Sequence, residues 1–379
     1  MKVFHILSNP YIGGIEGMLS NLIPRIDVRK WDIRIVNLRD DSKAYDLWDK
    51  SGVKYFRMKT PGKFLLGSVL SLAKVLKRER VNIVEIYGLR ANIIGRLAAK
   101  LAGVPVILTG ILSTDDWRRW NHVLVDRLTS WAVDGWVANS EACKRSQINR
   151  EKHPEERITV IYDGIDVDSW IHQGEDIRNE MRQKWGYNKQ NLIFVTIANL
   201  RPDKGVQYLV EAIPAVVERI PEARFVLVGS DWMGGKLQAR CKELSINDKV
   251  LFTGFCSDIH RIYHAADVVV LPSLREGLPI CLIEAMSMEL PVVASAVSGV
   301  PELVIERQTG LLVPSKDVKA LTETLLCIGQ DGKMRIEMGQ AGRKRVREKF
   351  TIERMANELT GYYEKKFENW KTRNLHEQL

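Results

Sequence analysis

The sequence predicts an α/β protein made of two doubly wound, parallel-sheet domains with a cleft between them. Short apolar, β-branched runs alternate with longer helix-like segments along most of the 379 residues. Such alternation is typical of parallel sheets covered by helices. The series of strands occurs twice, and a chain of this length is too long for one ordinary domain. The sequence therefore favours two domains of related architecture.

Strands are expected at the short apolar runs that lie between turn residues, and helices at the amphipathic stretches between them. The runs of the first half are 2–8, 32–37, 53–57, 82–87, 104–109, 135–138 and 158–161. Those of the second half are 191–198, 224–229, 249–253, 267–271, 291–295 and 310–313. Two of the clearest amphipathic stretches are 205–219 and 316–330.

The predicted domains are 1–170, 171–350 and a terminal helix over 351–379. The join is placed there because 168–190 is polar and contains no strand signal. Beyond about 350, apolar residues recur at helical spacing, which predicts one apolar helix face. This face is expected to pack back on the first domain: Met355, Leu359, Tyr362, Tyr363, Phe367 and Trp370.

Composition and charge exclude several classes of protein. No apolar run approaches the roughly 18 residues of a membrane span. The five cysteines are an odd number without metal-ligand spacing, which indicates reduced thiols in the cytoplasm. The net charge is +9, of which residues 1–170 carry +7. Because no nucleic-acid-binding motif accompanies this charge, an anionic membrane leaflet is the favoured partner and nucleic acid is not.

Two acidic residues, Glu276 and Glu284, form the most informative pattern in the chain. They follow the strand-like run 267–271, and the second lies in a helix-like run. Ligands of parallel α/β sheets bind at the carboxyl ends of strands. Pro279 is expected at the first helical position, where its missing N–H costs little. Free amides at Gly277 and Leu278 would then face an anion, while the carboxylates accept hydrogen bonds from sugar hydroxyls.

Two loops could hold the phosphates of such a ligand. Arg201 and Lys204 lie three residues apart after the run 191–198, where two cations could bind a diphosphate. Gly14 belongs to a glycine pair after the first strand, where a ligand could approach the backbone. A solvated basic loop and a tight turn without a ligand are the respective alternatives.

Further strand ends carry weaker signals. Gly229 and Phe255 each follow a strand-like run and could line a nucleobase pocket, although ordinary turns explain them as well. The pair Asp166 and Asp168 has the spacing of some metal sites, but it lies in the suspected interdomain junction. No metal site is therefore predicted.

Taken together, the second half closely resembles the family 4 retaining glycosyltransferases, the glycosyl transferases group 1, which have the GT-B fold. The resemblance covers about 190–330 and includes the two glutamates, Lys204 with Gly205, and the run Gly299-Val300-Pro301-Glu302. The first half resembles the family more loosely, through the glycine pair at Gly14 and the segment 88–96.

The resemblance implies a role for each matching residue. Glu284 would bind ribose hydroxyls, Glu276 the transferred sugar, and the amides of Gly277 and Leu278 the sugar or diphosphate. Lys204 would hold the diphosphate, which Gly14 approaches from the other domain. Retention of configuration and independence of metals and other cofactors are also implied.

Two departures from the family pattern concern the cations and the first domain. Asn199 stands where the family often has arginine, so Arg201 is expected to supply that charge. A histidine that the family often carries near the sugar is missing from the expected strand ends. The candidates on the acceptor side are therefore Asp115, Asp116 and Arg118, with a solvated loop as the alternative.

The predicted function is transfer of a sugar from a nucleotide-sugar, favoured to be a UDP-sugar over a GDP-sugar, to a hydroxyl of a glycan or lipid-linked acceptor in cell-surface polysaccharide synthesis. The alternatives are a non-catalytic nucleotide-sugar-binding protein and a GT-B enzyme of another kind, such as a sugar-nucleotide epimerase. A cytoplasmic protein, peripheral on the inner membrane leaflet, is expected. The basic amphipathic segment 63–80 is expected to face the core with a solvated basic end, and docking on that leaflet is the alternative.

Overall fold

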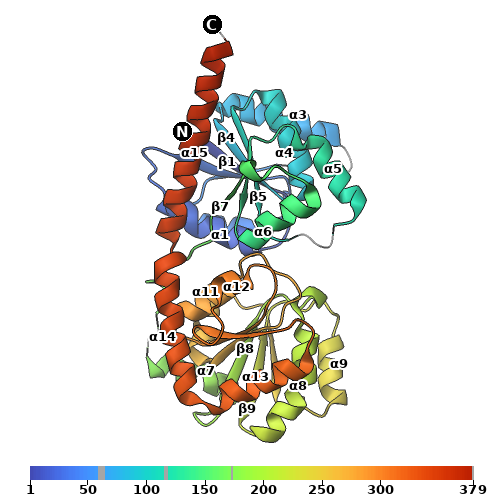
Figure 1. Cartoon of the computed structure of the whole chain (residues 1–379), viewed down its shortest axis with the longest axis vertical. Helices are drawn as coiled ribbons and strands as arrows, with labels where there is room; N and C mark the ends of the chain where they lie inside the picture. Colours follow the sequence, from blue (N-terminus) through green and yellow to red (C-terminus); the bar gives the residue numbers. More distant parts are fainter. Residues whose placement is uncertain (59–64, 115–117, 172–173, 378–379) are drawn as a thin grey trace. The chain divides into compact units, whose positions relative to one another are not determined.

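The computed structural model describes residues 1–58, 65–114, 118–171 and 174–377. These residues form two compact units, each of which is an α/β domain with one parallel sheet (Figure 1). Unit 1 comprises Met1–Gly164 and Ile352–Leu379, and unit 2 comprises Ile165–Thr351. The predicted fold class is confirmed, because both sheets are parallel and carry helices on both faces.

The sheet of unit 1 has the strand order β3-β2-β1-β4-β5-β6-β7. Its strands are β1 (Lys2–Leu7), β2 (Asp32–Asn37), β3 (Tyr55–Arg57), β4 (Ile83–Tyr87), β5 (Val106–Ile111), β6 (Gly135–Ala138) and β7 (Ile158–Val160). Its helices are α1 (Gly14–Leu22), α2 (Ala44–Lys50), α3 (Leu65–Glu79), α4 (Leu89–Ala102), α5 (Trp120–Ser130), α6 (Glu141–Ser146) and α15 (Ile352–Glu377), with the short turns η1 (Ile23–Arg25), η2 (Gln147–Glu151) and η3 (Glu155–Arg157).

The sheet of unit 2 has the strand order β10-β9-β8-β11-β12-β13. Its strands are β8 (Leu192–Ile197), β9 (Ala223–Val228), β10 (Val250–Gly254), β11 (Val268–Leu271), β12 (Val292–Ser295) and β13 (Gly310–Val313). Its helices are α7 (Glu175–Lys184), α8 (Val206–Arg219), α9 (Lys236–Glu243), α10 (Ile259–Ala265), α11 (Ile280–Ser287), α12 (Val300–Leu303), α13 (Val318–Gln330) and α14 (Gly332–Lys349), with the turn η4 (Pro202–Lys204).

Every run expected to be a strand overlaps one. The runs are apolar because helices cover both faces of each sheet. In β8, β11 and β12 nearly every residue is buried. Continuous apolar runs of this kind are typical of the strands of parallel sheets. The amphipathic stretch 205–219 forms α8, which packs its apolar face into the core of unit 2.

The C-terminal helix α15 supplies part of the core of unit 1. Ile352, Met355, Leu359 and Tyr363 are buried in one cluster with residues of β1, β2 and α1. The hydroxyl of Tyr363 also donates a hydrogen bond to the buried carboxylate of Glu85 on β4. The chain thus returns to unit 1 after completing unit 2.

The two units divide after Gly164 and after Thr351, compared with the predicted 170 and 350. At this point the N–H of Ile165 donates to the carbonyl of Phe350 at 3.0 Å, and Ile165 forms a parallel bridge with Thr351. The segment that enters unit 2 at Ile165 is therefore paired with the segment that leaves it at Thr351.

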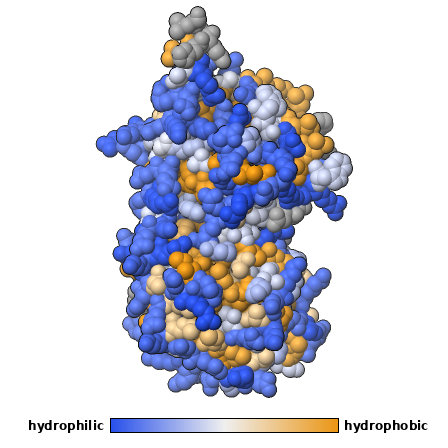
Figure 2. Space-filling view, in the orientation of Figure 1, coloured by the Kyte–Doolittle hydropathy of each residue, from blue (hydrophilic) through white to orange (hydrophobic). Residues whose placement is uncertain are grey.

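Hydrophilic residues cover most of the face shown in Figure 2. An orange, hydrophobic area stands out along the edge of unit 1 where Figure 1 places α3 and α5. Within the described residues, no helix combines the length and the apolar character needed to cross a bilayer.

Two glycines of unit 2 have nearly the same left-handed backbone but different surroundings. Substituting each by alanine therefore distinguishes the cost of backbone strain from the cost of steric overlap. Gly205 has φ +65°, and a Cβ added there would overlap the carbonyl oxygen of Pro272. Gly234 has φ +63°, and a Cβ there would meet nothing within 4 Å. We expect Gly234→Ala to lower the free energy of unfolding of unit 2 by about 1 kcal/mol. Gly205→Ala should lower it by about 3 kcal/mol or more.

Calorimetry of the unit 2 transition in both variants measures this difference. Equal losses of stability would show that the loop after β8 does not depend on contact with Pro272.

Candidate functional site

The candidate site lies at the point in the sheet of unit 2 where the chain changes direction. β8 and β11 are paired neighbours, but β9 and β10 extend the sheet on one side while β12 and β13 extend it on the other. A crevice opens outside the carboxyl ends of the strands at such a point in α/β sheets. The loops that follow β8 and β11 are therefore the expected place for a ligand.

These two loops touch through their backbones. The N–H of Leu274 donates to the carbonyl of Asp203 at 2.8 Å. Gly205 lies so close to Pro272 that only a residue without a side chain fits there. The contact places the side chains that follow β8 directly beside those that follow β11.

Lys204 and Glu276 form an ion pair across this contact. The Nζ of Lys204 lies 2.7 Å from Oε1 of Glu276, and the side chain of Glu276 is only 9% exposed. The hydroxyl of Ser273 donates to the same oxygen at 2.6 Å. Because both donors use Oε1, the other carboxylate oxygen has no partner among the described residues and is left for a ligand.

Glu284 lies in α11 with a neutral partner. The hydroxyl of Tyr263, on α10, donates to its Oε2 at 2.8 Å. Burial raises the pKa of Glu284 to about 7, and the hydrogen bond from Tyr263 only partly offsets this rise. Near neutral pH the carboxyl group therefore exists in both forms, and it can accept or donate a hydrogen bond to a hydroxyl.

The start of α11 differs by one position from the prediction for Pro279. Pro279 is the N-cap with φ −76° and ψ 105°, and its carbonyl accepts from the N–H of Leu282 at 3.1 Å. The first helical residue is Ile280, because the backbone of Pro279 is still extended. The N–H groups of Gly277 and Leu278, just before the helix, have no acceptor among the described residues. Both residues precede the N-cap, so their N–H groups lie beside the start of α11 and are not among its own N-terminal amides. Their binding of an anion stays a prediction.

The other residues predicted on the donor side form no hydrogen bond or ion pair with Glu276 or Glu284. Arg201 turns to Asp203, with Nη2 3.1 Å from Oδ2, and does not contact Glu276. Asn199 lies in the loop after β8, where its carbonyl accepts from the N–H of Arg201. Gly229 is required by its backbone, since a Cβ there would overlap the carbonyl of Ala198. Phe255 is exposed just after β10, the edge strand of the sheet.

In unit 1, Gly14 is the first residue of α1, and a Cβ added to it would meet nothing within 4 Å. The backbone at Gly14 is therefore open to an approaching group. Asp115 and Asp116 lie outside the described residues.

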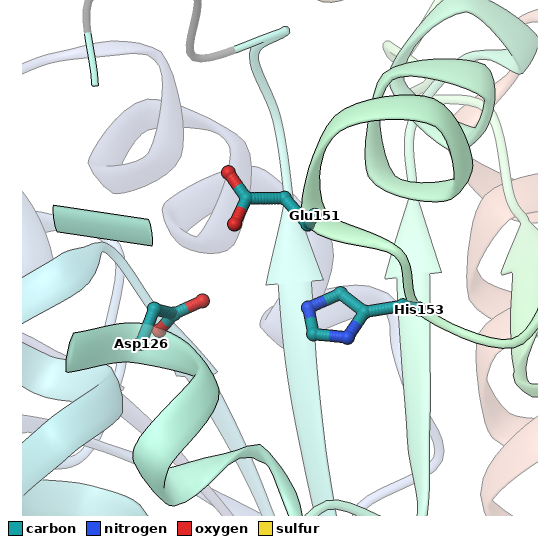
Figure 3. Close-up of side chains that lie close together, drawn as sticks. All are labelled: Asp126, Glu151 and His153. Carbon is teal, nitrogen blue, oxygen red and sulfur yellow. The ribbon is translucent and has the colours of Figure 1, made fainter. Parts of the chain in front are cut away.

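Arg118, also predicted on the acceptor side, is buried and does not lie in a solvated loop. Its Nη1 lies 3.5 Å from Asp126 and 3.8 Å from Glu151. The side chains of Asp126, Glu151 and His153 point toward one another, with candidate ligand atoms within 4.8 Å (Figure 3). Arg96 approaches Asp126 at 2.9 Å, so two guanidinium groups already balance the two carboxylates. We interpret this group as a buried ion-pair cluster and not as a metal centre.

Two partners of the glutamates were not found from the sequence. Ser273 is the second residue after the strand β11, and its place in the loop at a strand end is a signal that could have identified it. Tyr263 lies in the short helix α10, and nothing in the sequence indicates that it reaches Glu284.

Comparison with known proteins divides the chain in the same way as its two units. Residues 12–169 match the model of the family described as Glycosyltransferase Family 4. Residues 177–345 match the model described as Glycosyl transferases group 1.

Several relatives match over nearly their full length. An uncharacterised glycosyltransferase of Methanocaldococcus jannaschii is 30% identical over 93% of this chain and 94% of its own. The UDP-Gal:alpha-D-GlcNAc-diphosphoundecaprenol alpha-1,3-galactosyltransferase of Escherichia coli is 26% identical over 96% of both chains. The crystal structure of Anabaena HepE in complex with UDP-glucose superimposes with a TM-score of 0.88, at 19% identity, and covers 96% of this chain and 100% of that one.

The raised pKa of Glu284 predicts a loss of stability as the pH rises. In the unfolded chain this carboxyl titrates near its ordinary pKa of 4.5, whereas in the folded state it titrates near 7. Between these values the folded state binds the proton more strongly, so raising the pH from about 4.5 to 7 removes up to about 3 kcal/mol of stability. Glu284→Gln keeps an acceptor for Tyr263 and should remove this part of the pH dependence from the unit 2 transition.

Thermal unfolding of both proteins across this pH range is the measurement, with the exposed Glu218→Gln as the matched control. The assignment is wrong if Glu284→Gln and wild type lose stability in parallel.

Proposed function

This chain belongs to glycosyltransferase family 4 of the group 1 glycosyl transferases, and we propose that it transfers a sugar from a UDP-sugar to a hydroxyl of a lipid-linked glycan in cell-surface polysaccharide synthesis. The proposal of a uridine nucleotide and a lipid-linked acceptor is supported by the E. coli relative, whose name specifies UDP-galactose and a diphosphoundecaprenol-linked sugar. A GDP-sugar is the alternative donor.

One observation carries the proposal. Lys204, Glu276 and the free N–H groups before α11 lie together where the strand order of the sheet reverses, beyond the ends of β8 and β11. A nucleotide-sugar needs a cation and amides for its diphosphate, and carboxylates for its hydroxyls. We assign the diphosphate to Lys204 with the amides of Gly277 and Leu278. The transferred sugar is assigned to Glu276 and the ribose to Glu284.

The remaining donor contacts are proposed from the family resemblance alone. Gly14 would approach the diphosphate, and Asn199, Gly229 and Phe255 would surround the nucleoside. Arg201 is a weaker candidate for the diphosphate than Lys204, because its guanidinium donates a hydrogen bond to Asp203. It would have to leave that partner to reach a phosphate.

The reaction breaks the bond between the anomeric carbon and the diphosphate oxygen, the acceptor oxygen bonds to the same carbon, and the proton of the acceptor hydroxyl passes to the departing diphosphate. Negative charge grows on the departing diphosphate. The amine of Lys204 and the two N–H groups are donors aimed at that charge, and they act in a partly buried place where they are more effective than in water.

Glu276 is proposed to position the sugar through its unpartnered carboxylate oxygen. Its other oxygen is occupied by Lys204 and Ser273. Retention of configuration, catalysis without a metal, and action at the cytoplasmic face of a membrane are also proposed from the resemblance. A rate that is unchanged by a chelator would support the second of these.

We expect Lys204→Met to lower the rate of sugar transfer by about 10²–10³, because a donor to the leaving group is lost. This variant leaves Glu276 without its cation, so the double variant Lys204→Met with Glu276→Gln serves as the test that the protein still folds. Lys242→Met, at an exposed lysine of α9, is the matched control and should keep the wild-type rate. Full activity of Lys204→Met would remove this residue from the site.

Donor binding can be measured without knowing the acceptor. A ligand present at 100 times its Kd should raise the free energy of unfolding by about 2.7 kcal/mol, and unit 2 should be the part that becomes more stable. We expect UDP and a UDP-sugar to give this shift and Glu284→Ala to reduce it. A shift with GDP alone would select the alternative donor, and no shift with any nucleotide would contradict the site.

A further inference from the structure

The helix α5 has its polar side turned inward and its apolar side turned outward. Trp120, Leu124, Leu128 and Trp131 recur at spacings of three and four along α5 and its C-cap, so they share one face, and they are 79%, 50%, 65% and 67% exposed. Asp126, on the opposite side, is 2% exposed. A helix that only served the core would have the reverse arrangement.

The inward polar side is held by specific bonds, so the outward apolar side is a defined feature of the fold. Asp126 accepts from Arg96 at 2.9 Å and from Asn92 at 3.1 Å, both of which lie on α4. Arg96 also donates to the hydroxyl of Thr129 at 3.1 Å. Turning the helix to bury its tryptophans would break this cluster and leave the Arg96 charge buried without a partner.

A second helix adds to the same surface. On α3, Leu66 and Leu70 are exposed, and α4 packs against both α3 and α5. The orange area at this edge of unit 1 in Figure 2 is consistent with one continuous surface. We call it the docking face and define it as Leu66, Leu70, Trp120, Leu124, Leu128 and Trp131.

The charges beside the docking face are positive. Lys74, Lys77 and Arg78 are exposed on α3, and Arg119 and Arg127 are exposed at α5. The acidic residue of each helix is already neutralised. Glu79 on α3 pairs with Lys2 at 3.3 Å, and Asp126 on α5 pairs with Arg96 as described. The surface is therefore apolar in its centre and cationic at its margins.

We propose that the docking face inserts into the headgroup region of an anionic phospholipid bilayer. Tryptophans at both ends of an exposed helix are typical of the membrane–water interface, where the ring is apolar and its N–H is hydrated. Basic residues at the margin suit anionic headgroups. This inference extends the membrane part of the proposed function, and it identifies α5 with the N-terminal part of α3 as the surface in contact with lipid.

The backbone N–H and C=O groups of α5 are hydrogen-bonded within the helix. Lipid would therefore contact α5 mainly through its side chains. The ion pairs of Asp126 with Arg96 and Arg118 then hold α5 in place on unit 1.

Co-flotation of the full chain with vesicles tests the proposal. We expect wild type to bind vesicles of phosphatidylglycerol and phosphatidylethanolamine and to bind vesicles of phosphatidylcholine much more weakly. Trp120→Ser with Leu128→Ser should reduce binding to the anionic vesicles by about tenfold or more, since two inserted side chains are lost. Lys74→Gln with Lys77→Gln should also reduce it, and added salt should weaken the wild type in the same way.

Ile336→Ser is the matched control, because Ile336 is 63% exposed on α14 of unit 2 and should not contact lipid. A docking-face variant that floats as well as wild type overturns the proposal. So does a variant that only converts a dimer into a monomer in sedimentation velocity, because the face would then bind a second copy of the chain.

The same samples separate this proposal from the proposed function. The stabilisation by UDP-sugar is measured without lipid, and the docking-face variant should keep it. If wild type binds the nucleotide but no anionic vesicle, the docking face is wrong and the donor site stands. If it binds vesicles but no nucleotide, the donor site is wrong and the docking face stands.

Discussion

The close contact between the loop after β8 and the loop after β11 determines the chemistry that unit 2 can perform. Residues about seventy positions apart are placed side by side because Gly205 has no side chain to hold the two backbones apart. Lys204 and Glu276 are consequently paired before any ligand arrives. If a diphosphate binds here as we propose, it must share the lysine with the carboxylate of Glu276, and its affinity would then reflect a competition between two anions for one cation.

Buried acids serve two different purposes in the two units. Glu284 has a neutral partner in Tyr263, whose hydrogen bond only partly offsets the effect of burial, so its pKa is raised to about 7. Asp126 has two cationic partners, which balance its charge and fix the position of α5. The first arrangement suits a group that exchanges hydrogen bonds with a ligand, and the second suits a group that holds a helix in place.

The sequence was sufficient to predict the fold, the order of the strands along the chain, and the positions of Lys204 and Glu276 in loops that follow strands. These follow from patterns that are local, namely apolar runs, turn residues and strand ends. The direction of a side chain across the fold is not local. Arg201 binds Asp203, Arg118 is buried, and Tyr263 reaches Glu284, and each of these depends on how separate helices pack. The exposed side of α5 also could not be read from its sequence, since an apolar stripe is normally taken as the buried one.

The return of the chain to unit 1 has a consequence for biosynthesis. The core around β1 contains Ile352, Leu359 and Tyr363, which are synthesised after the whole of unit 2. While the ribosome is still adding them, the first 164 residues lack one wall of their core, although unit 2 is already complete. Unit 2 can therefore finish folding before unit 1 does, and a chain truncated before α15 would lose part of the core of the domain that was translated first.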